Sequence, residues 1–483
     1  MTWLKSLSRR EGRSVTLKDI PLEEWRNLKE IGIDIVWLMG MWQRSPYSKN
    51  RARQSKGLVD AGRNLLPDFT VEDVDGSPYA IYEYIPDDRF GTLAHLEALK
   101  RIMEDEGLFL ILDFVPNHTA CDNPWTKSHL EYFVHTKRSQ ADKCPDGFFP
   151  RIGCSDDICI AHGKDPYFPP WDDTAQVNYS NKNTSEAMAD LLCRLSDYCH
   201  GLRCDMAMLP LKEVFQETWK DILNNECPDF WPGAIEKLRA KESMCILIAE
   251  VYWGKEPELL EYGFDYTYDK LLYDLMVKGD IQGLKGHIAL PVEYQEYMVR
   301  FMENHDEPRA LKTFGYDRIE SAMVIHATLP GMRFWQYGQF EGRKYHYPVQ
   351  FSRSPDEPED RTHSAFCKKL LIEVDDTVFH EGTWAICATH GWPDNDSHKN
   401  LLAWCWTTNN TRRLIIVNFS NEPVEGYIDF PKELYPHTEG IVCRDLLSND
   451  IFRRSTAEVK QEGLCVFLDS FDFHFFNIEA VPK

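Results

Sequence analysis

The sequence lacks any long hydrophobic run, since none of its apolar stretches approaches the roughly 20 residues of a membrane-spanning helix. Positive charge is also scarce, because 54 Lys and Arg residues face 77 Asp and Glu residues and give a formal net charge of −23. No dense run of Lys and Arg offsets that excess, which makes nucleic acid and anionic membranes poor partners. The first residues contain neither the hydrophobic segment nor the cleavage site of a secretory signal. We therefore expect a cytoplasmic protein without a nucleic-acid or membrane partner.

The fourteen cysteines lack the spacing of a disulfide framework or of a zinc site. Neither Cys154 with Cys159 nor Cys193 with Cys199 has the C-x-x-C spacing of a zinc ligand pair, and no Cys/His set completes a site. Several other cysteines lie in apolar runs, as buried free thiols do in a reducing compartment. The cysteine pattern therefore also favours the cytoplasm.

What the sequence does contain is a long alternation of strand-like and helix-like segments. At 483 residues the chain exceeds the ~250–300 residues that one hydrophobic core usually serves. Amphipathic stretches such as 93–106 and 185–200, each followed by a glycine, separate short apolar runs. Eight strands are expected, at Thr2–Leu7, Ile33–Leu38, Leu108–Val115, Leu202–Met206, Cys245–Trp253, Phe264–Tyr268, Val299–Glu303 and Met332–Tyr337. Eight strands joined by crossover helices predict an α/β fold, the (β/α)8 TIM barrel.

Two regions interrupt this alternation. Residues 119–178 show no clear helix and far exceed the usual 2–6 residues of a loop between a strand and a helix, so they form a loop subdomain inserted after strand three. After about Val378 the pattern becomes all-β, with short strands expected at Leu401–Trp406, Arg413–Phe419, Val424–Phe430 and Cys465–Phe476. The predicted domains are a barrel at 1–118 and 179–376, the inserted domain at 119–178, and a C-terminal antiparallel β-sandwich at 377–483.

Charged side chains collect where the predicted barrel strands end. Strand three ends in Asp113-Phe-Val-Pro-Asn117-His118, strand four in Arg203-Cys204-Asp205, strand five in Ala249-Glu250, and strand seven in Asn304-His305-Asp306. The C-terminal ends of barrel strands converge on one site. Three carboxylates in one pocket suit the cleavage of a glycosidic bond, which needs a carboxylate beside the anomeric carbon and a proton donor at the leaving oxygen.

Neighbouring groups would assign different tasks to these carboxylates. Arg203 lies two residues before Asp205, so both side chains project from the same face of a strand, and the guanidinium holds Asp205 ionised. Crowding by the other two carboxylates is expected to keep Glu250 protonated near neutral pH. His118 and His305 are expected to donate hydrogen bonds to sugar hydroxyls.

These strings resemble, in order, the four short signature regions of the α-amylase superfamily, glycoside hydrolase family thirteen. The resemblance covers essentially the whole chain and implies a domain B after strand three and a C-terminal β-domain. It implies that Asp205 is the nucleophile, Glu250 the general acid/base and Asp306 the transition-state stabiliser. It also implies sugar contacts from a further set of residues: Tyr79, His118, Arg203, His305 and Arg309. For Tyr79 a core position is the alternative, and for Arg309 a surface ion pair.

The resemblance also bears on cofactors. Asn117 matches a calcium ligand of the classical amylases, and Asp172 and Asp173 are the further oxygen donors within reach along the chain. The alternative is that Asn117 only caps the strand end. The chemistry itself requires no cofactor, and a structural calcium ion is the one metal that the resemblance implies.

Departures from the family pattern limit what can be said of the substrate. Met208 and Leu209 stand where many α-amylases have Lys-His, and Ala80 stands where family exo-glucosidases have Asp. The first interpretation is a retaining α-glycoside hydrolase that acts on α-1,4-glucan or malto-oligosaccharides. The alternatives are a transglycosylase or a sucrose or oligosaccharide phosphorylase with the same three carboxylates, and a non-catalytic relative that serves as a binding subunit.

Overall fold

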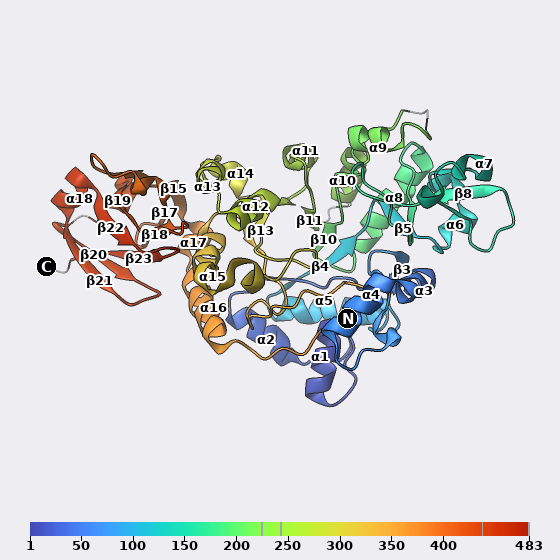
Figure 1. The fold of residues 1–483 in the computed structure, drawn as a ribbon, viewed down its shortest axis with the longest axis horizontal. Coiled ribbons are helices and arrows are strands. Elements are labelled where there is room, and N and C mark those ends of the chain that lie inside the picture. Colours follow the sequence, from blue (N-terminus) through green and yellow to red (C-terminus); the bar gives the residue numbers. More distant parts are fainter. Residues whose placement is uncertain (224–225, 242–243, 437, 482–483) are drawn as a thin grey trace. The chain divides into compact units, whose positions relative to one another are not determined.

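The computed structural model describes residues 1–223, 226–241, 244–436 and 438–481 (Figure 1). The chain divides into two compact units. The first contains Met1–Tyr268 and Tyr347–Asp356, and the second contains Asp269–His346 and Glu357–Lys483. Within the described ranges, no helix has both the length and the apolar character needed to cross a membrane. The cytoplasmic compartment stays a prediction.

The first unit is built on five parallel strands in the order β1-β4-β10-β11-β12. Their bounds are β1 (Ile35–Trp37), β4 (Phe109–Phe114), β10 (Gly201–Cys204), β11 (Ile246–Ala249) and β12 (Tyr266–Tyr268). Arg203 of β10 pairs with Asp113 of β4 on one side and with Ile248 of β11 on the other. Because the strands are parallel and in this register, the residues that follow them emerge at one edge of the sheet.

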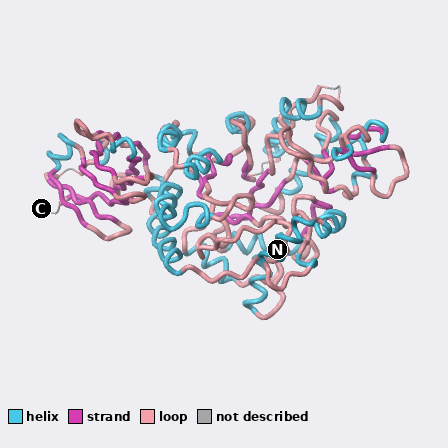
Figure 2. The backbone as a smooth tube through the Cα atoms, in the orientation of Figure 1, coloured by secondary structure: helices cyan, strands magenta, loops and turns pink. Residues whose placement is uncertain are grey.

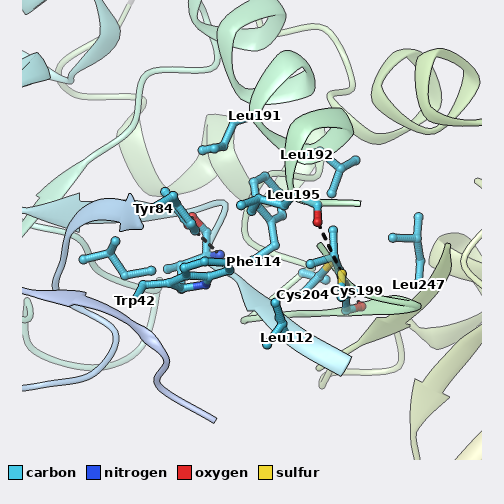
Figure 3. Close-up of a cluster of buried hydrophobic side chains, with 14 of the residues drawn as sticks. Trp42, Tyr84, Leu112, Phe114, Leu191, Leu192, Leu195, Cys199, Cys204 and Leu247 are labelled. Atoms are coloured by element: carbon cyan, nitrogen blue, oxygen red, sulfur yellow. Dashed lines mark hydrogen bonds between the residues drawn. The ribbon is translucent and has the colours of Figure 1, made fainter. Parts of the chain in front are cut away.

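Helices follow most of these strands. The first unit contains α1 (Thr2–Glu11), α2 (Leu22–Glu30), α3 (Pro46–Gln54), α4 (Lys56–Leu65), α5 (Leu93–Asp105), α8 (Lys182–Leu195), α9 (Lys212–Trp219), α10 (Trp231–Ala240) and α11 (Glu256–Glu261), with the hairpin β2 (Trp42–Arg44) and β3 (Ile81–Pro86) and the short helix η1 (Val71–Asp73). The hydroxyl of Thr92 caps α5 by accepting the N–H of His95. Figure 3 shows leucines of α8 in the buried cluster that also contains Leu112 and Phe114 of β4. Helices α5 and α8 overlap the stretches 93–106 and 185–200 that periodicity predicted as helical.

The first expected strand is wrong, because residues 2–7 belong to helix α1. Leu4 and Leu7 are its buried residues, and their spacing of three is that of a helix face. Gly12, with a φ of 64°, ends the helix in the left-handed conformation that glycine adopts readily. The other seven expected barrel strands are present, five in the first unit and two in the second.

The segment inserted after β4 forms its own small structure. It contains β5 (His118–Ala120), α6 (Trp125–Ser128), η2 (Leu130–Tyr132), β6 (His135–Lys137), α7 (Arg138–Ala141), η3 (Pro145–Gly147), β7 (Phe148–Pro150), β8 (Ile158–Ala161) and β9 (Thr174–Gln176). The strands pair as β5-β9 and as β6-β8-β7, both antiparallel. Phe133, Phe149 and Ile160 form part of a separate buried cluster. The two short helices were not expected, because four residues are too few to show a periodicity.

The second unit contains β13 (Met298–Arg300) and β14 (Met332–Arg333), which pair in parallel. Its helices are α12 (Lys270–Lys278), α13 (Ile281–Ile288), α14 (Val292–Gln295), α15 (Ala310–Thr328), α16 (Arg361–Val374) and α17 (Val378–Glu381). The region from Thr383 onward is mostly strand (Figure 2). It contains β15 (Thr383–Ile386), β16 (Ala388–His390), η4 (Ser397–Asn400), β17 (Leu401–Thr407), β18 (Arg412–Asn418), β19 (Val424–Asp429), η5 (Lys432–Leu434), β20 (Gly440–Asp445), β21 (Ile451–Ser455), α18 (Thr456–Glu462), β22 (Leu464–Leu468) and β23 (Phe473–Ala480).

These C-terminal strands form two antiparallel sheets, β15-β17-β18-β23-β20-β21 and β16-β19-β22. Residues of both sheets, such as Ile416, Ile428 and Ile478, share one buried cluster, as in a β-sandwich. The expected single strand at Cys465–Phe476 is two strands, because the chain turns after β22 and Phe471 takes a φ of 54°. The individual domain boundaries predicted from the sequence stay predictions.

Candidate active site

The guanidinium of Arg203 binds the two carboxylates that follow neighbouring parallel strands. Its Nη1 lies 2.6 Å from Oδ1 of Asp205, and its Nη2 lies 2.7 Å from Oε2 of Glu250. A third carboxylate, Oδ1 of Asp113, lies 3.8 Å from Nη1. All four side chains are buried, and Arg203 is only 1% exposed. The structure therefore places Asp205 and Glu250 around one guanidinium, as expected for residues at the ends of neighbouring parallel strands.

Aromatic rings surround the same guanidinium. Its central carbon lies 5.0 Å from the ring centroid of Trp37, 5.4 Å from that of Tyr79 and 5.8 Å from that of Tyr268. The hydroxyl of Tyr268 also accepts a hydrogen bond of 3.4 Å from Nε. Burial disfavours the charge of Arg203, but Glu250, the tyrosines and Asp205 outweigh burial and hold its pKa well above the usual value. Arg203 is thus a permanent cation in a dry aromatic setting.

Glu250 has two further hydrogen-bond partners. The hydroxyl of Tyr252 donates to its Oε1 at 2.7 Å, and the backbone N–H of Met206 donates to its Oε2 at 2.8 Å. Met206 directly follows Asp205 and has a φ of 43°, in the left-handed region that non-glycine residues rarely occupy. The turn after β10 therefore points a main-chain donor at the carboxylate that follows β11, which fixes how Glu250 lies relative to Asp205.

His118 is buried at the start of β5. Burial lowers its pKa to about 4, although Asp173 and a hydrogen bond with the backbone of Tyr79 act in the opposite direction. The ring of Trp171 packs against it, with 5.2 Å between the centroids. His118 is therefore a neutral imidazole at neutral pH, able to donate one hydrogen bond and accept another.

Asp306 and its neighbours lie in the second unit, after β13. The amide oxygen of Asn304 accepts the N–H of Asp306 at 2.9 Å, and Nε2 of His305 lies 3.0 Å from the Asp306 carboxylate. The Asp306 side chain is 55% exposed, whereas His305 is buried. Whether Asp306 and His305 join Asp205 and Glu250 around one sugar stays a prediction.

Arg309 is buried rather than part of a surface ion pair. Its Nη1 lies 2.7 Å from Oε1 of Glu303, and its Nη2 donates to the carbonyl of Tyr337 at 3.0 Å. Burial raises the pKa of Glu303 to about 7, against the pull of Arg309. A sugar contact by Arg309 stays a prediction, and in this arrangement its guanidinium serves protein partners.

The side chains predicted as calcium ligands are engaged with protein groups. Oδ1 of Asn117 accepts a hydrogen bond of 3.0 Å from Gln176, Asp172 pairs with Arg51, and Asp173 accepts from Ser48. Across the described residues, no group of three or more His, Cys, Asp or Glu side chains could hold a metal ion. Arranged in this way, these side chains do not offer the six or more oxygens that calcium takes. Calcium binding stays a prediction without support from this geometry.

Several residues of the site were missing from the sequence prediction. Asp113 lies in the segment that ends the predicted third strand but was given no role, and Tyr252 and Tyr268 were not predicted as site residues. The signal for Tyr268 was its place at the end of a predicted strand. Met208 and Leu209, which stand where many α-amylases have Lys-His, are buried in the hydrophobic core.

Comparison with known proteins places this arrangement in a class. The chain matches solved structures along most of its length: a noncanonic maltogenic alpha-amylase, AmyB, from Thermotoga neapolitana is similar over 95% of this chain and 94% of its own, with a TM-score of 0.68 and 20% identity. This likeness confirms the expected fold class, a TIM barrel with an insertion after the third strand and a C-terminal antiparallel β-domain.

The profile described as the alpha amylase catalytic domain matches residues 22–369. The chain therefore belongs to the alpha-amylase family, which confirms the family resemblance seen in the sequence. Alpha-amylase MalA of Haloarcula japonica is 23% identical over 416 residues, 82% of this chain and 51% of that protein. A probable oligo-1,6-glucosidase 2 of Bacillus subtilis is 21% identical over 353 residues, 64% of this chain and 58% of that protein. The chain thus spans only about half the length of these curated relatives.

Proposed function

We propose that the protein is a retaining α-glycoside hydrolase that acts on α-1,4-glucan or malto-oligosaccharides through a covalent glycosyl-enzyme. The observation that carries the proposal is the binding of Asp205 and Glu250 to one buried guanidinium. Two carboxylates held by one group are close together, and the shorter carboxylate spacing is the one that a retaining mechanism uses. The substrate class rests on membership of the family and on the aromatic rings that surround Arg203.

In the first step Asp205 attacks the anomeric carbon while Glu250 gives its proton to the leaving oxygen, so that the glycosidic bond breaks as the enzyme–sugar bond forms. Arg203 orients Asp205 as an ionised nucleophile. In the second step Glu250 takes a proton from water, the water oxygen attacks the anomeric carbon, and Asp205 leaves. The ion pair between Arg203 and Glu250 suits this second step, in which Glu250 acts as a base.

The first step requires protonated Glu250, whereas the ion pair with Arg203 stabilises the ionised carboxylate. Crowding by Asp205 and Asp306 was expected to keep Glu250 protonated, but the Arg203 guanidinium, 2.7 Å from the Glu250 carboxylate, favours its ionised form. Binding of a sugar between the carboxylates must therefore weaken that ion pair. The role of Asp306 as transition-state stabiliser belongs to the same proposal and rests on the family resemblance.

The test is incubation with maltoheptaose, sucrose and trehalose, with the anomeric form of the products followed by NMR. We expect α-configured products from maltoheptaose, and a loss of at least ~10³-fold in kcat for Asp205→Asn and Glu250→Gln. Exposed carboxylates on α8 provide the controls Asp190→Asn and Glu186→Gln, which should keep wild-type turnover.

Other outcomes separate the alternatives. Products of inverted configuration, or full activity in either site variant, would contradict the mechanism. Transfer to an added sugar or to phosphate, in preference to water, would instead assign the transglycosylase or phosphorylase reaction. Saccharide binding without any turnover would assign the role of a binding subunit.

A further inference from the structure

A buried ion pair closes the segment 303–310, which joins β13 to α15 in the second unit (Figure 1). Glu303 is 1% exposed and Arg309 is 2% exposed, and Nη1 of Arg309 lies 2.7 Å from Oε1 of Glu303. The other carboxylate oxygen of Glu303 accepts the N–H of Ala310, the first residue of α15, at 2.5 Å. One buried carboxylate therefore ties the beginning of the segment to its end.

The residues between these two ends include His305 and Asp306, and hydrogen bonds hold them as well. The amide oxygen of Asn304 accepts the N–H groups of Asp306 and Glu307, each at 2.9 Å. Nε2 of His346 lies 2.9 Å from the carbonyl oxygen of His305. The Asp306 side chain is 55% exposed, so burial does not fix its position. Where this carboxylate lies therefore depends on the main chain that carries it.

Arg309 also connects the segment to the residues that follow β14. Its Nη2 donates to the carbonyl of Tyr337 at 3.0 Å. The next residue, Gly338, has a φ of 92°, and a Cβ atom added there would lie only 2.2 Å from Nη2 of Arg309. The guanidinium thus packs directly on the main chain, a close approach that requires glycine at this position. The pair of Glu303 and Arg309 therefore joins the residues after β13 to those after β14.

Opposing influences set the charge of Glu303. Burial raises the pKa of Glu303 to about 7, although Arg309 and the N–H of Ala310 favour the ionised carboxylate. Glu341 and Glu357, which come after β14 in the chain, repel that carboxylate and also raise its pKa. Above this pH Glu303 is an anion paired with Arg309, whereas below it the carboxyl is neutral and loses the charge interaction with the guanidinium.

We propose that the ionised carboxylate of Glu303 is a positioning group that holds His305 and Asp306 in the arrangement that the transition state needs. The proposal rests on the proposed function, in which Asp306 stabilises the transition state. Glu303 is buried and acts through Arg309 and the first N–H of α15 rather than by touching the sugar. An interaction that matters only in the transition state lowers kcat when it is lost and leaves KM nearly unchanged.

The test compares the wild-type protein with Glu303→Gln, which keeps the size of the side chain and removes its charge. Steady-state kinetics with maltoheptaose are measured at about pH 8.5 and about pH 5.5, on either side of the pKa of Glu303. At about pH 8.5 we expect kcat to fall about tenfold or more, with KM within about twofold of the wild-type value. At about pH 5.5, where wild-type Glu303 is itself neutral, the two kcat values should come within about threefold of one another.

The control is Glu479→Gln on β23, which removes the same kind of charge from a solvent-accessible ion pair with Arg444. It should leave kcat and KM unchanged at both pH values. Thermal unfolding shows whether each variant is folded. If Glu303→Gln is not folded, Arg309→Lys takes its place, because a lysine keeps the charge but cannot reach Glu303 and the Tyr337 carbonyl together. We expect the same fall in kcat at the higher pH, with little change in KM.

The outcomes distinguish the positioning role from the proposed function. A wild-type protein that does not cleave maltoheptaose would overturn the proposed function and the positioning role with it. With an active wild type, a folded Glu303→Gln that keeps the wild-type kcat at the higher pH would overturn the positioning role alone. A rise in KM without a fall in kcat would do the same, because it indicates a contribution to substrate binding. An equal ratio of the kcat values at the two pH values would also overturn it, because a merely structural role does not depend on the charge of Glu303.

Discussion

At the scale of single residues, the geometry of Arg203 matters more than its charge. Two separate nitrogens of one planar guanidinium hold Asp205 and Glu250 at the same time. A lysine ammonium is a single point charge and cannot reproduce two donors at that separation. The positions of the two carboxylates relative to one another therefore depend on an arginine.

This makes the conservative substitution Arg203→Lys informative. We expect kcat to fall by about 10²–10³-fold, because the nucleophile and the acid/base lose their common support. Steady-state kinetics with maltoheptaose measure the effect, and thermal unfolding shows whether the variant is folded. Arg138→Lys, in the exposed ion pair of Arg138 with Asp157, is the matched control. An unchanged kcat in Arg203→Lys would show that positive charge alone is sufficient.

At the scale of the elements, helix α15 contains a break that only glycine fits. Gly315 lies within its bounds with a φ of 68° and a ψ of 174°, outside the helical region. A Cβ atom added there would meet nothing within 4 Å, so the only cost of a side chain is in the backbone. This backbone region is essentially restricted to glycine.

We therefore expect Gly315→Ala to lower the free energy of unfolding by about 1–3 kcal/mol without any steric clash. Gly286→Ala is the control, because Gly286 lies within helix α13, has no positive φ and has equally open surroundings. That substitution should raise the free energy of unfolding by about 0.5–1 kcal/mol. Urea unfolding of both variants measures the difference, and equal effects of the same sign would refute the argument.

Individual elements also show where local sequence patterns are enough to predict the secondary structure. Helix α5 was predicted within one residue of its end, because the Thr92 cap and the glycine after it are local signals. Residues 2–7 were misassigned because a short amphipathic stretch fits a strand or a helix, and packing of Leu4 and Leu7 decides between them. Strand β14 has only two residues, fewer than the apolar run that predicted it, since pairing rather than hydrophobicity sets strand ends.

At the scale of the whole molecule, buried histidines make stability depend on pH. Burial lowers the pKa of His118 and of His326 to about 4. The unfolded chain, with histidine near pH 6.5, binds more protons than the folded chain between these values. Stability is therefore fully present above about pH 6.5 and is lost as the pH falls toward 4.

His326 tests this directly, since it is buried in the second unit and its Nε2 lies 2.9 Å from the carbonyl oxygen of Arg300. We expect the stability advantage of the wild type over His326→Gln to shrink by about 2 kcal/mol between about pH 7 and about pH 5, because only the wild type must protonate a buried imidazole on unfolding. Chemical denaturation at both pH values measures it. His380→Gln, at an exposed histidine, should show no such change, and a constant advantage for His326 would contradict the prediction.

The order of residues along the chain determined the alternation of strands and helices, the inserted segment, the C-terminal strands and the strand ends that carry Arg203, Asp205 and Glu250. These features depend on periodicity, caps and turns within a few residues, which a sequence displays directly. Only the tertiary structure decided that one guanidinium holds two carboxylates, that Asn117, Asp172 and Asp173 serve protein partners, and that Arg309 donates to the carbonyl of Tyr337. Apart from that of Arg203 with Asp205, those contacts join residues far apart in the sequence, such as Ser48 and Asp173, and their atomic geometry follows from packing, which no local pattern records.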